Sequence, residues 1–138
     1  MLLVAQERKI VKTMRILIVN PFGIGDVLFS TPMISNLKIA HPESYIGYIC
    51  NIRAKEALYN NPQINEIFVF EKDEYRNLWR QSKFKCIKKF ITFYIKIKKK
   101  NFDLAIDLSL GHQYSLFLWL IGVRKRIGYN YRNRGRFL

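Results

Sequence analysis

The fold is decided by residues 14–32, a strand-like run followed by a glycine loop and the start of a helix. The run reads Met14-Arg15-Ile16-Leu17-Ile18-Val19-Asn20, and the continuation reads Pro21-Phe22-Gly23-Ile24-Gly25-Asp26-Val27-Leu28-Phe29-Ser30-Thr31-Pro32. A short apolar run rich in β-branched residues is typical of a strand buried on both faces of a parallel sheet. The sequence therefore predicts a buried first strand that leads into a glycine loop.

The loop combines two glycines with one acid. Gly23 and Gly25 are predicted to allow backbone angles that other residues avoid and to let a substrate approach the main chain closely. Asp26 follows at the point where the apolar spacing becomes helical. Because open α/β sheets bind ligands outside the carboxyl ends of their strands, we expect Asp26 to lie at the mouth of a binding crevice.

Three other interpretations of this loop compete. A dinucleotide-binding fingerprint needs a third glycine where Leu28 stands, and the next predicted strand ends in Cys50-Asn51 instead of the acid that would hold a ribose. A phosphate-binding loop needs Gly-Lys-Ser/Thr after its glycines, and this sequence has none. In the third interpretation Asp26 only caps the helix, which is compatible with a catalytic role.

The rest of the chain alternates apolar runs with helical segments. This alternation predicts an α/β fold in which helices cover both faces of a parallel sheet. A helix starts either at Asp26, bending at Pro32, or at Thr31 as N-cap with Pro32 in the first position. Gly122 is the expected stop of the last helix. The further predicted strands cover 45–50, 67–70, 102–108 and 126–129, and the further predicted helices lie at 53–59, within the crossover 71–100, and at 114–121.

The long crossover contains an amphipathic helix. Its apolar side is predicted to consist of Phe84, Ile87, Ile91 and Tyr94, with a lysine-rich side opposite. In the simpler interpretation the apolar side covers the sheet and the basic side is solvated. In the alternative, the basic and aromatic composition also binds an anionic membrane leaflet, and both can hold together.

The chain is strongly basic, and the excess charge is localised. The net charge is +14, and sixteen of the 24 basic residues lie in two acid-free segments, Arg76 to Lys100 and Arg124 to Arg136. This distribution predicts an anionic partner, which could be a phosphorylated sugar-lipid, a membrane surface or a nucleic acid. A basic nucleic-acid-binding module is therefore an alternative, although no recognised nucleic-acid motif supports it.

The remaining composition limits the class of protein. At 138 residues the chain is one domain at most, with a hydrophobic content of 49%. The isolated Cys50, Cys86, His41 and His112 predict no metal site and a reducing, cytoplasmic location. Residues 1–13 are expected to be an N-terminal extension and not a signal peptide, and no apolar run approaches the roughly 20 residues that span a bilayer.

Two sequence blocks together resemble a known family. The first is the strand, the glycine loop with Gly23-Ile24-Gly25-Asp26-Val27-Leu28 and the following Thr31-Pro32; the second is Phe102-Asp103-Leu104-Ala105-Ile106-Asp107-Leu108 with the later Arg126-Ile127-Gly128-Tyr129. From about Met14 onward the chain resembles glycosyltransferase family 9, the ADP-heptose:lipopolysaccharide heptosyltransferases. The resemblance implies a Rossmann-like N-terminal half of a GT-B enzyme, covering residues 14–138. It also implies that Asp26 is the general base that deprotonates the acceptor hydroxyl.

The family implies inverting transfer of a sugar from a nucleotide sugar, ADP-heptose, to a lipopolysaccharide core acceptor. The nucleotide sugar is a co-substrate, and no cofactor or metal is expected. Family members continue into a second, donor-binding domain, so we expect this chain to be a fragment that is inactive alone, with a non-catalytic remnant as an alternative. The expected location is cytoplasmic, with peripheral contact to the inner membrane.

Further side chains are candidates for acceptor binding. The arginine fork binds carboxylates and phosphates in pairs, which makes Arg76, Arg80, Arg132 and Arg134 the candidates, each with solvated surface as the alternative. Asp107 is expected either to face the same crevice as Asp26 or to cap the next helix. The chain has Asp107-Leu108-Ser109 where the family usually shows Asp-x-Gln-Gly, which weakens any role for residue 109. Because an exposed carboxylate is a weak base, we also expect Asp26 to be buried against Phe22 or Phe29.

Overall fold

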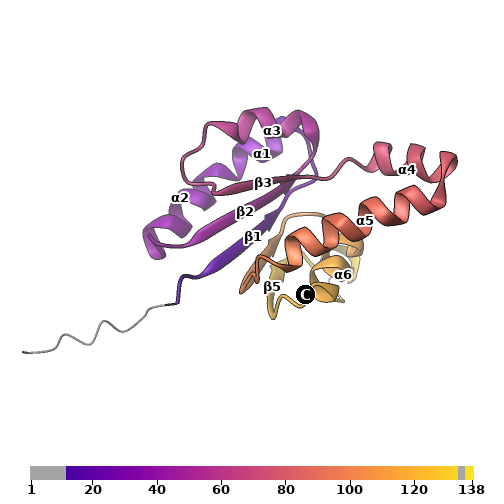
Figure 1. Cartoon of the computed structure of the whole chain (residues 1–138). Helices are drawn as coiled ribbons and strands as arrows, with labels where there is room; N and C mark the ends of the chain where they lie inside the picture. Colours follow the sequence, from indigo (N-terminus) through magenta and orange to yellow (C-terminus); the bar gives the residue numbers. More distant parts are fainter. Residues whose placement is uncertain (1–11, 134–135) are drawn as a thin grey trace, which may run out of the picture.

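Five parallel strands form one sheet in the computed structural model, which describes residues 12–133 and 136–138 (Figure 1). The strand order is β3-β2-β1-β4-β5, and every neighbouring pair is parallel. The predicted α/β fold with a parallel sheet is confirmed. The strands are β1 (Arg15–Val19), β2 (Tyr45–Cys50), β3 (Glu66–Val69), β4 (Leu104–Asp107) and β5 (Lys125–Gly128).

Strand β1 lies in the middle of the sheet and is buried on both faces. Ile18 pairs with Tyr48 of β2 on one side and with Ile106 of β4 on the other. Because successive side chains of a strand point to opposite faces, Ile16 and Ile18 enter one core and Leu17 and Val19 enter the other. The predicted burial of the first strand is confirmed.

Helices cover both faces of the sheet (Figure 1). The first core packs the strands against α1, α2 and α3, and the second packs them against α5 and α6. Helix α4 contacts α5 and extends past the sheet (Figure 1). The helices are α1 (Ile24–Phe29), α2 (Thr31–Ala40), α3 (Ile52–Tyr59), α4 (Lys72–Gln81), α5 (Lys83–Lys98) and α6 (His112–Leu120), with a short 3₁₀ helix η1 (Tyr131–Asn133).

The helical segment after the glycine loop is broken at Ser30. Ser30 is the N-cap of α2, and Pro32 stands in its first turn, where the missing amide hydrogen costs nothing. The Ser30 hydroxyl donates to the Val27 carbonyl oxygen at 2.6 Å, and the Tyr48 hydroxyl lies 2.7 Å from the same Ser30 oxygen. The alternative with a separate second helix is therefore right, although its N-cap is Ser30 and not Thr31.

The crossover differs from the prediction in two ways. It forms two helices, broken at Ser82, whose hydroxyl oxygen accepts from the Lys85 amide and caps α5. Helix α5 is also rotated relative to the expected face: its buried residues are Cys86 and Ile97. Three of the four residues predicted to face the sheet are exposed, namely Phe84 (77%), Ile87 (48%) and Ile91 (48%), whereas Tyr94 is half-buried against the core.

The apolar pattern of α5 explains the error. Helical spacing also connects Cys86, Phe90, Phe93 and Ile97, so the sequence carries two apolar stripes. Phe93 and Phe90 both contact Phe117 of α6, with ring centroids 5.8 and 6.0 Å apart. Docking of α6 therefore selects the stripe that periodicity alone could not choose.

Several boundaries shift by one or two residues. Strand β3 begins at Glu66, β4 is shorter than the predicted run, and α6 begins at His112. Gly122 has a φ of 85°, a backbone conformation that favours glycine, and it ends α6 as predicted. Within the described residues, none of the helices combines the length and the apolarity that a bilayer crossing requires.

Candidate active site

Asp26 lies in the first turn of α1, immediately beyond the carboxyl end of β1. The N-cap of this helix is Gly23, and no side chain caps it. The interpretation of Asp26 as the capping residue is therefore wrong, although its negative charge does lie at the positive end of the helix dipole. Within the described residues the Asp26 carboxylate makes no hydrogen bond or ion pair, so both oxygens are open to a ligand.

Two asparagines hold the glycine loop in place. Buried Asn20 accepts from the Phe22 amide at 3.2 Å and donates to the Asp26 carbonyl at 3.3 Å. Asn51, at the end of β2, donates to the Phe22 carbonyl at 2.8 Å, and its Oδ1 accepts from the Ala54 amide at 2.9 Å as the N-cap of α3. Because both asparagines end neighbouring buried strands, the loop that carries Asp26 is anchored to the centre of the sheet.

The glycines of the loop do not have unusual backbone angles. Gly23 has a φ of −70°, and Gly122 is the glycine with positive φ among the described residues. The expectation that these glycines supply unusual backbone angles is therefore wrong. A Cβ on Gly25 would meet nothing within 4 Å, and one on Gly23 would meet only the Asp26 carboxylate at 4.0 Å. The space beside both residues is open, so their role in substrate binding stays a prediction.

Asp26 lines an open cleft of about 390 Å³ at the carboxyl end of the sheet. The cleft joins the glycine loop and the end of α1 to the segments after β4 and β5. Asp26 is exposed, and Phe29 is 86% exposed, so the expected burial of the carboxylate against these aromatic rings is absent. The lining residues are Asn20, Phe22, Asp26, Phe29, Ser30, Met33, Leu108, Leu110 and Tyr129.

The cleft places a single carboxylate among apolar and neutral polar groups. Asp26 is the acid of this lining, and a carboxylate within hydrogen-bond reach of a hydroxyl can remove its proton. Ser30 lines the cleft, and its hydroxyl is hydrogen-bonded to the hydroxyl of buried Tyr48. Burial raises the pKa of Tyr48, whose hydroxyl is protonated at neutral pH. The arrangement can bind a polar ring over an apolar floor and deprotonate it at one position.

Asp107 does not share this cleft. It ends β4 with its side chain on the face of Ala105, which belongs to the core formed with Tyr114 and Phe117 of α6. Its Oδ1 accepts from the Ser109 amide at 2.9 Å, and the N-cap of α6 is Gly111. Both expectations for Asp107, the shared crevice and the helix cap, are therefore wrong.

Burial has a measurable cost at Asp107, which is only 2% exposed. Desolvation raises its pKa, whereas the bonds with Ser109 lower it by less. A carboxyl with a raised pKa in the folded state stabilises the fold below the ordinary carboxyl pKa, and this contribution is lost as the pH rises through the folded-state value. Asp107→Asn should therefore unfold at higher urea than the parent chain at pH 7, with a difference that shrinks toward pH 3.

The control for this titration is Glu43→Gln, because Glu43 is exposed, has no hydrogen-bond or ion-pair partner among the described residues, and its replacement removes the same charge. Its effect on the urea midpoint should change little over the same pH range. A difference between Asp107→Asn and the parent chain that grows toward low pH would contradict the assignment.

The three predicted arginines that the structure describes do not line the cleft. Arg76 and Arg80 are exposed on α4, where the Arg76 guanidinium lies 3.3 Å from the Asp73 carboxylate. Arg132 is exposed in η1, three residues beyond Tyr129, with its guanidinium 5.2 Å from the Tyr131 ring centroid. Arg134 lies outside the described residues. The binding roles of these arginines stay predictions.

Neither cysteine is suited to chemistry in this region. Cys50 and Cys86 are free and buried, and burial raises the pKa of the Cys50 thiol to about 11, so it is protonated at neutral pH. Over residues 12–133 and 136–138, no three His, Cys, Asp or Glu side chains are grouped closely enough to hold a metal ion. The prediction that the transfer needs no metal stays a prediction.

Sequence reasoning missed several residues of the site. Asn20 and Asn51 end predicted strands, and an asparagine in that position is a signal for a loop anchor. Leu110 and Tyr129 enter the cleft from segments far along the chain, and no local pattern indicates this.

No family model matches the chain. It is 27% identical over 113 residues to lipopolysaccharide heptosyltransferase 3 of Escherichia coli, which covers 80% of this chain and 31% of that protein. It is also 25% identical to a glycosyl transferase family 9 structure from Veillonella parvula DSM 2008, with a TM-score of 0.68, covering 84% of this chain and 32% of that one. The predicted resemblance to glycosyltransferase family 9 is confirmed.

A further solved structure shares the fold at lower sequence identity. E. coli heptosyltransferase WaaC with ADP-2-deoxy-2-fluoro heptose matches with a TM-score of 0.75 and 19% identity, covering 90% of this chain and 40% of that one. The chain thus has the fold found in part of these GT-B enzymes. It spans about a third of the length of the curated relatives that it matches.

Proposed function

We propose that this chain forms the acceptor-side domain of an inverting glycosyltransferase that transfers heptose from ADP-heptose to a lipopolysaccharide core acceptor. The observation that carries the proposal is the position of Asp26, an unpaired carboxylate in an open cleft at the carboxyl end of the central strand. The names of the relatives support the acceptor class, since they are lipopolysaccharide heptosyltransferases. The ADP-sugar in the similar WaaC structure supports the donor class.

In the proposed mechanism, Asp26 accepts the proton of the acceptor hydroxyl as that oxygen attacks the anomeric carbon of the donor. The new bond forms on the face opposite the leaving nucleotide, which inverts the configuration. Attack from that face requires the donor to be held across the cleft, so we propose that a second domain binds the nucleotide sugar and that this chain alone does not turn over. The transfer is proposed to need no metal or other cofactor, and to take place in the cytoplasm.

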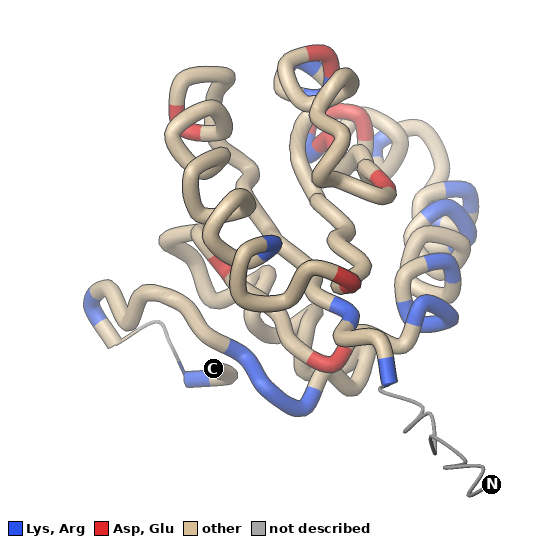
Figure 2. Tube along the Cα trace, turned by 90° about the vertical axis from the view of Figure 1, so that its left-hand side faces the viewer, with Lys and Arg blue, Asp and Glu red and all other residues tan. Residues whose placement is uncertain are grey.

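Charge supports an anionic acceptor. The described basic residues gather along α5 and along β5 with the residues after it (Figure 2). Arg132 follows β5 near Tyr129 of the cleft, which makes it the first candidate for a phosphate or carboxylate of the acceptor. The direct test of the proposal is loss of transfer when the aspartate that matches Asp26 is replaced in a full-length homologue.

We also propose that the outer stripe of α5 contacts an anionic membrane surface, which is where a lipid-linked acceptor would be found. Phe84, Ile87, Ile91 and Ile95 are each at least 42% exposed and follow one another at helical spacing. Lysines flank this stripe, and an apolar stripe between basic residues is typical of helices that lie in the interface of anionic bilayers.

The membrane proposal predicts that Ile87→Asp/Ile91→Asp lowers binding to phosphatidylglycerol-containing vesicles by about tenfold, because two inserted side chains become charged. Vesicle sedimentation at constant salt measures the effect. The matched control, Ile39→Asp/Ile52→Asp, changes two exposed isoleucines of α2 and α3 on the other face of the sheet. If both double variants lost vesicle binding equally, the change in net charge alone would explain the loss, and contact through α5 would be refuted.

A further inference from the structure

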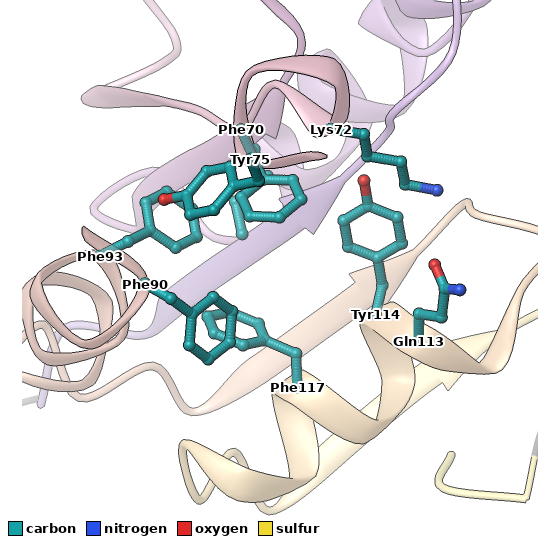
Figure 3. Close-up of a pocket in the computed structure, with 9 residues that line it drawn as sticks. Phe70, Lys72, Tyr75, Phe90, Phe93, Gln113, Tyr114 and Phe117 are labelled. Carbon is teal, nitrogen blue, oxygen red and sulfur yellow. The ribbon is translucent and has the colours of Figure 1, made fainter. Parts of the chain in front are cut away.

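An aromatic cavity lies on the α5 and α6 face of the sheet, on the opposite face from the helices that frame the Asp26 cleft. It has a volume of about 240 Å³ and opens between α4, α5, α6 and the residue that follows β3 (Figure 3). Figure 3 shows the rings of Phe70, Tyr75, Phe90, Phe93 and Phe117 directed toward one another around it. The remaining lining residues are Ile49, Lys72, Gln113 and Tyr114.

The aromatic rings make the lining of the cavity apolar. Phe70 stacks on Tyr75 with centroids 4.6 Å apart, and Phe70 also contacts Phe93 at 5.4 Å. Polar groups enter the lining at Lys72, Gln113 and the Tyr114 hydroxyl, which lie together at one end in Figure 3. A cavity lined mainly by rings favours an apolar occupant, and its volume is below the roughly 300–1,000 Å³ of pockets that take a whole small molecule. It therefore suits the apolar part of a larger ligand.

A basic groove adjoins the cavity. Its lining includes Lys85, Lys88, Lys89 and Lys96, together with Tyr75 and Phe93, which also line the cavity. Lys89 pairs with Glu74, and Lys96 lies 3.9 Å from Glu66. Among the described residues, Lys85 and Lys88 are the groove lysines that have no carboxylate partner.

We propose that the cavity and the groove together bind one anionic amphiphile. Its aliphatic chain passes between Tyr75 and Phe93 into the cavity, and its phosphate or carboxylate lies against Lys85 and Lys88. The groove is the more basic end, because it carries Lys85 and Lys88 without a carboxylate partner among the described residues, whereas Lys72 at the opposite end of the cavity is accompanied by Glu71 and Asp107, which both act electrostatically on Tyr114. The identification of this amphiphile with the lipid part of the acceptor rests on the proposed function, whereas the binding of an amphiphile does not.

Calorimetric titration of the 138-residue chain with monomeric dodecyl phosphate, below its micelle concentration, tests the proposal. One molecule should bind per chain, and hexyl phosphate should bind at least tenfold more weakly because it fills less of the cavity. Inorganic phosphate alone and dodecanol alone should both bind more weakly than dodecyl phosphate. Several molecules per chain, or equal binding of the hexyl and dodecyl phosphates, would overturn the assignment.

Two matched pairs of variants locate the binding. Lys85→Gln/Lys88→Gln should weaken dodecyl phosphate about tenfold, whereas Lys83→Gln/Lys99→Gln, which removes two charges from the same region outside the groove, should change it less than twofold. Phe90→Ser should weaken binding about tenfold, and Ile91→Ser, next to it on the outer stripe, should not. Circular dichroism checks that each variant is folded, and if Phe90→Ser is not, the lysine pair still decides.

Vesicles separate this site from simple membrane contact. Binding to anionic vesicles without binding to monomeric dodecyl phosphate would assign the basic face to a bilayer surface and overturn the role of the cavity. The measurement needs no sugar donor. A negative result therefore leaves the proposed transfer intact, and loss of the proposed transfer would not affect amphiphile binding.

Discussion

Replacing the aspartate that matches Asp26 by asparagine in a full-length homologue should reduce transfer on the order of 10²- to 10⁴-fold, which is the usual contribution of a general base. The asparagine keeps the shape of the side chain but cannot take up the hydroxyl proton. The loss should be in kcat, with little change in the KM for the acceptor, because binding does not depend on that proton. Initial rates over a range of acceptor concentrations measure both constants.

Two further observations make this test specific. Asp26 is exposed and its carboxylate is unpaired in the described residues, so the melting temperature of the asparagine variant should match that of the parent enzyme. A glutamate variant should retain more activity than the asparagine variant. Full turnover in the asparagine variant would refute the assignment of the base.

The second large effect concerns stability. Ile18→Ala should lower the free energy of unfolding by about 2–5 kcal/mol, the range for removing a large buried aliphatic side chain. Ile18 is fully buried in the central strand, where it pairs with both neighbouring strands and packs in the core beneath α1 and α2. Since small domains are stable by only about 5–15 kcal/mol, the variant should lose a large part of its total stability. Urea unfolding followed by circular dichroism measures the change.

Ile39→Ala is the matched control for this prediction. The same atoms are removed at a position that is 77% exposed on α2, where alanine also has the better helix propensity. Its free energy of unfolding should change by no more than about 0.5 kcal/mol. A loss at Ile18 no larger than the loss at Ile39 would show that the central strand is not packed as described.

Local sequence was sufficient for the elements whose residues allow only one stable placement in the fold. The first strand is apolar at consecutive positions, so both of its faces must be covered, and only an interior place in a parallel sheet does this. The alternation of strands and helices along the chain was also predicted from local apolar spacing. Local sequence further places Asp26 beyond the carboxyl end of the first strand, because the residues after that strand are a glycine loop and the start of a helix.

Local sequence was insufficient wherever the apolar spacing allowed either of two faces of a helix or strand to be buried. Helix α5 carries two apolar stripes, and contact with Phe117 of α6 decides which one is buried. The side to which Asp107 points depends on the register of β4 beside β1, where Asp107 pairs with Val19. An error of one residue in the strand would reverse that side.

The sequence alone determined the sheet class, the buried central strand and the position of Asp26, because each depends on residues that are close together in the chain. The tertiary structure alone decided the walls of the cleft and of the aromatic cavity. Leu110 and Tyr129 line the same cleft as Asp26 although they are far from it in the chain, and Tyr75 of α4 contacts Phe90 of α5 only because α4 folds back on α5. Such contacts arise from the packing of whole helices and strands, which no local pattern of residues contains.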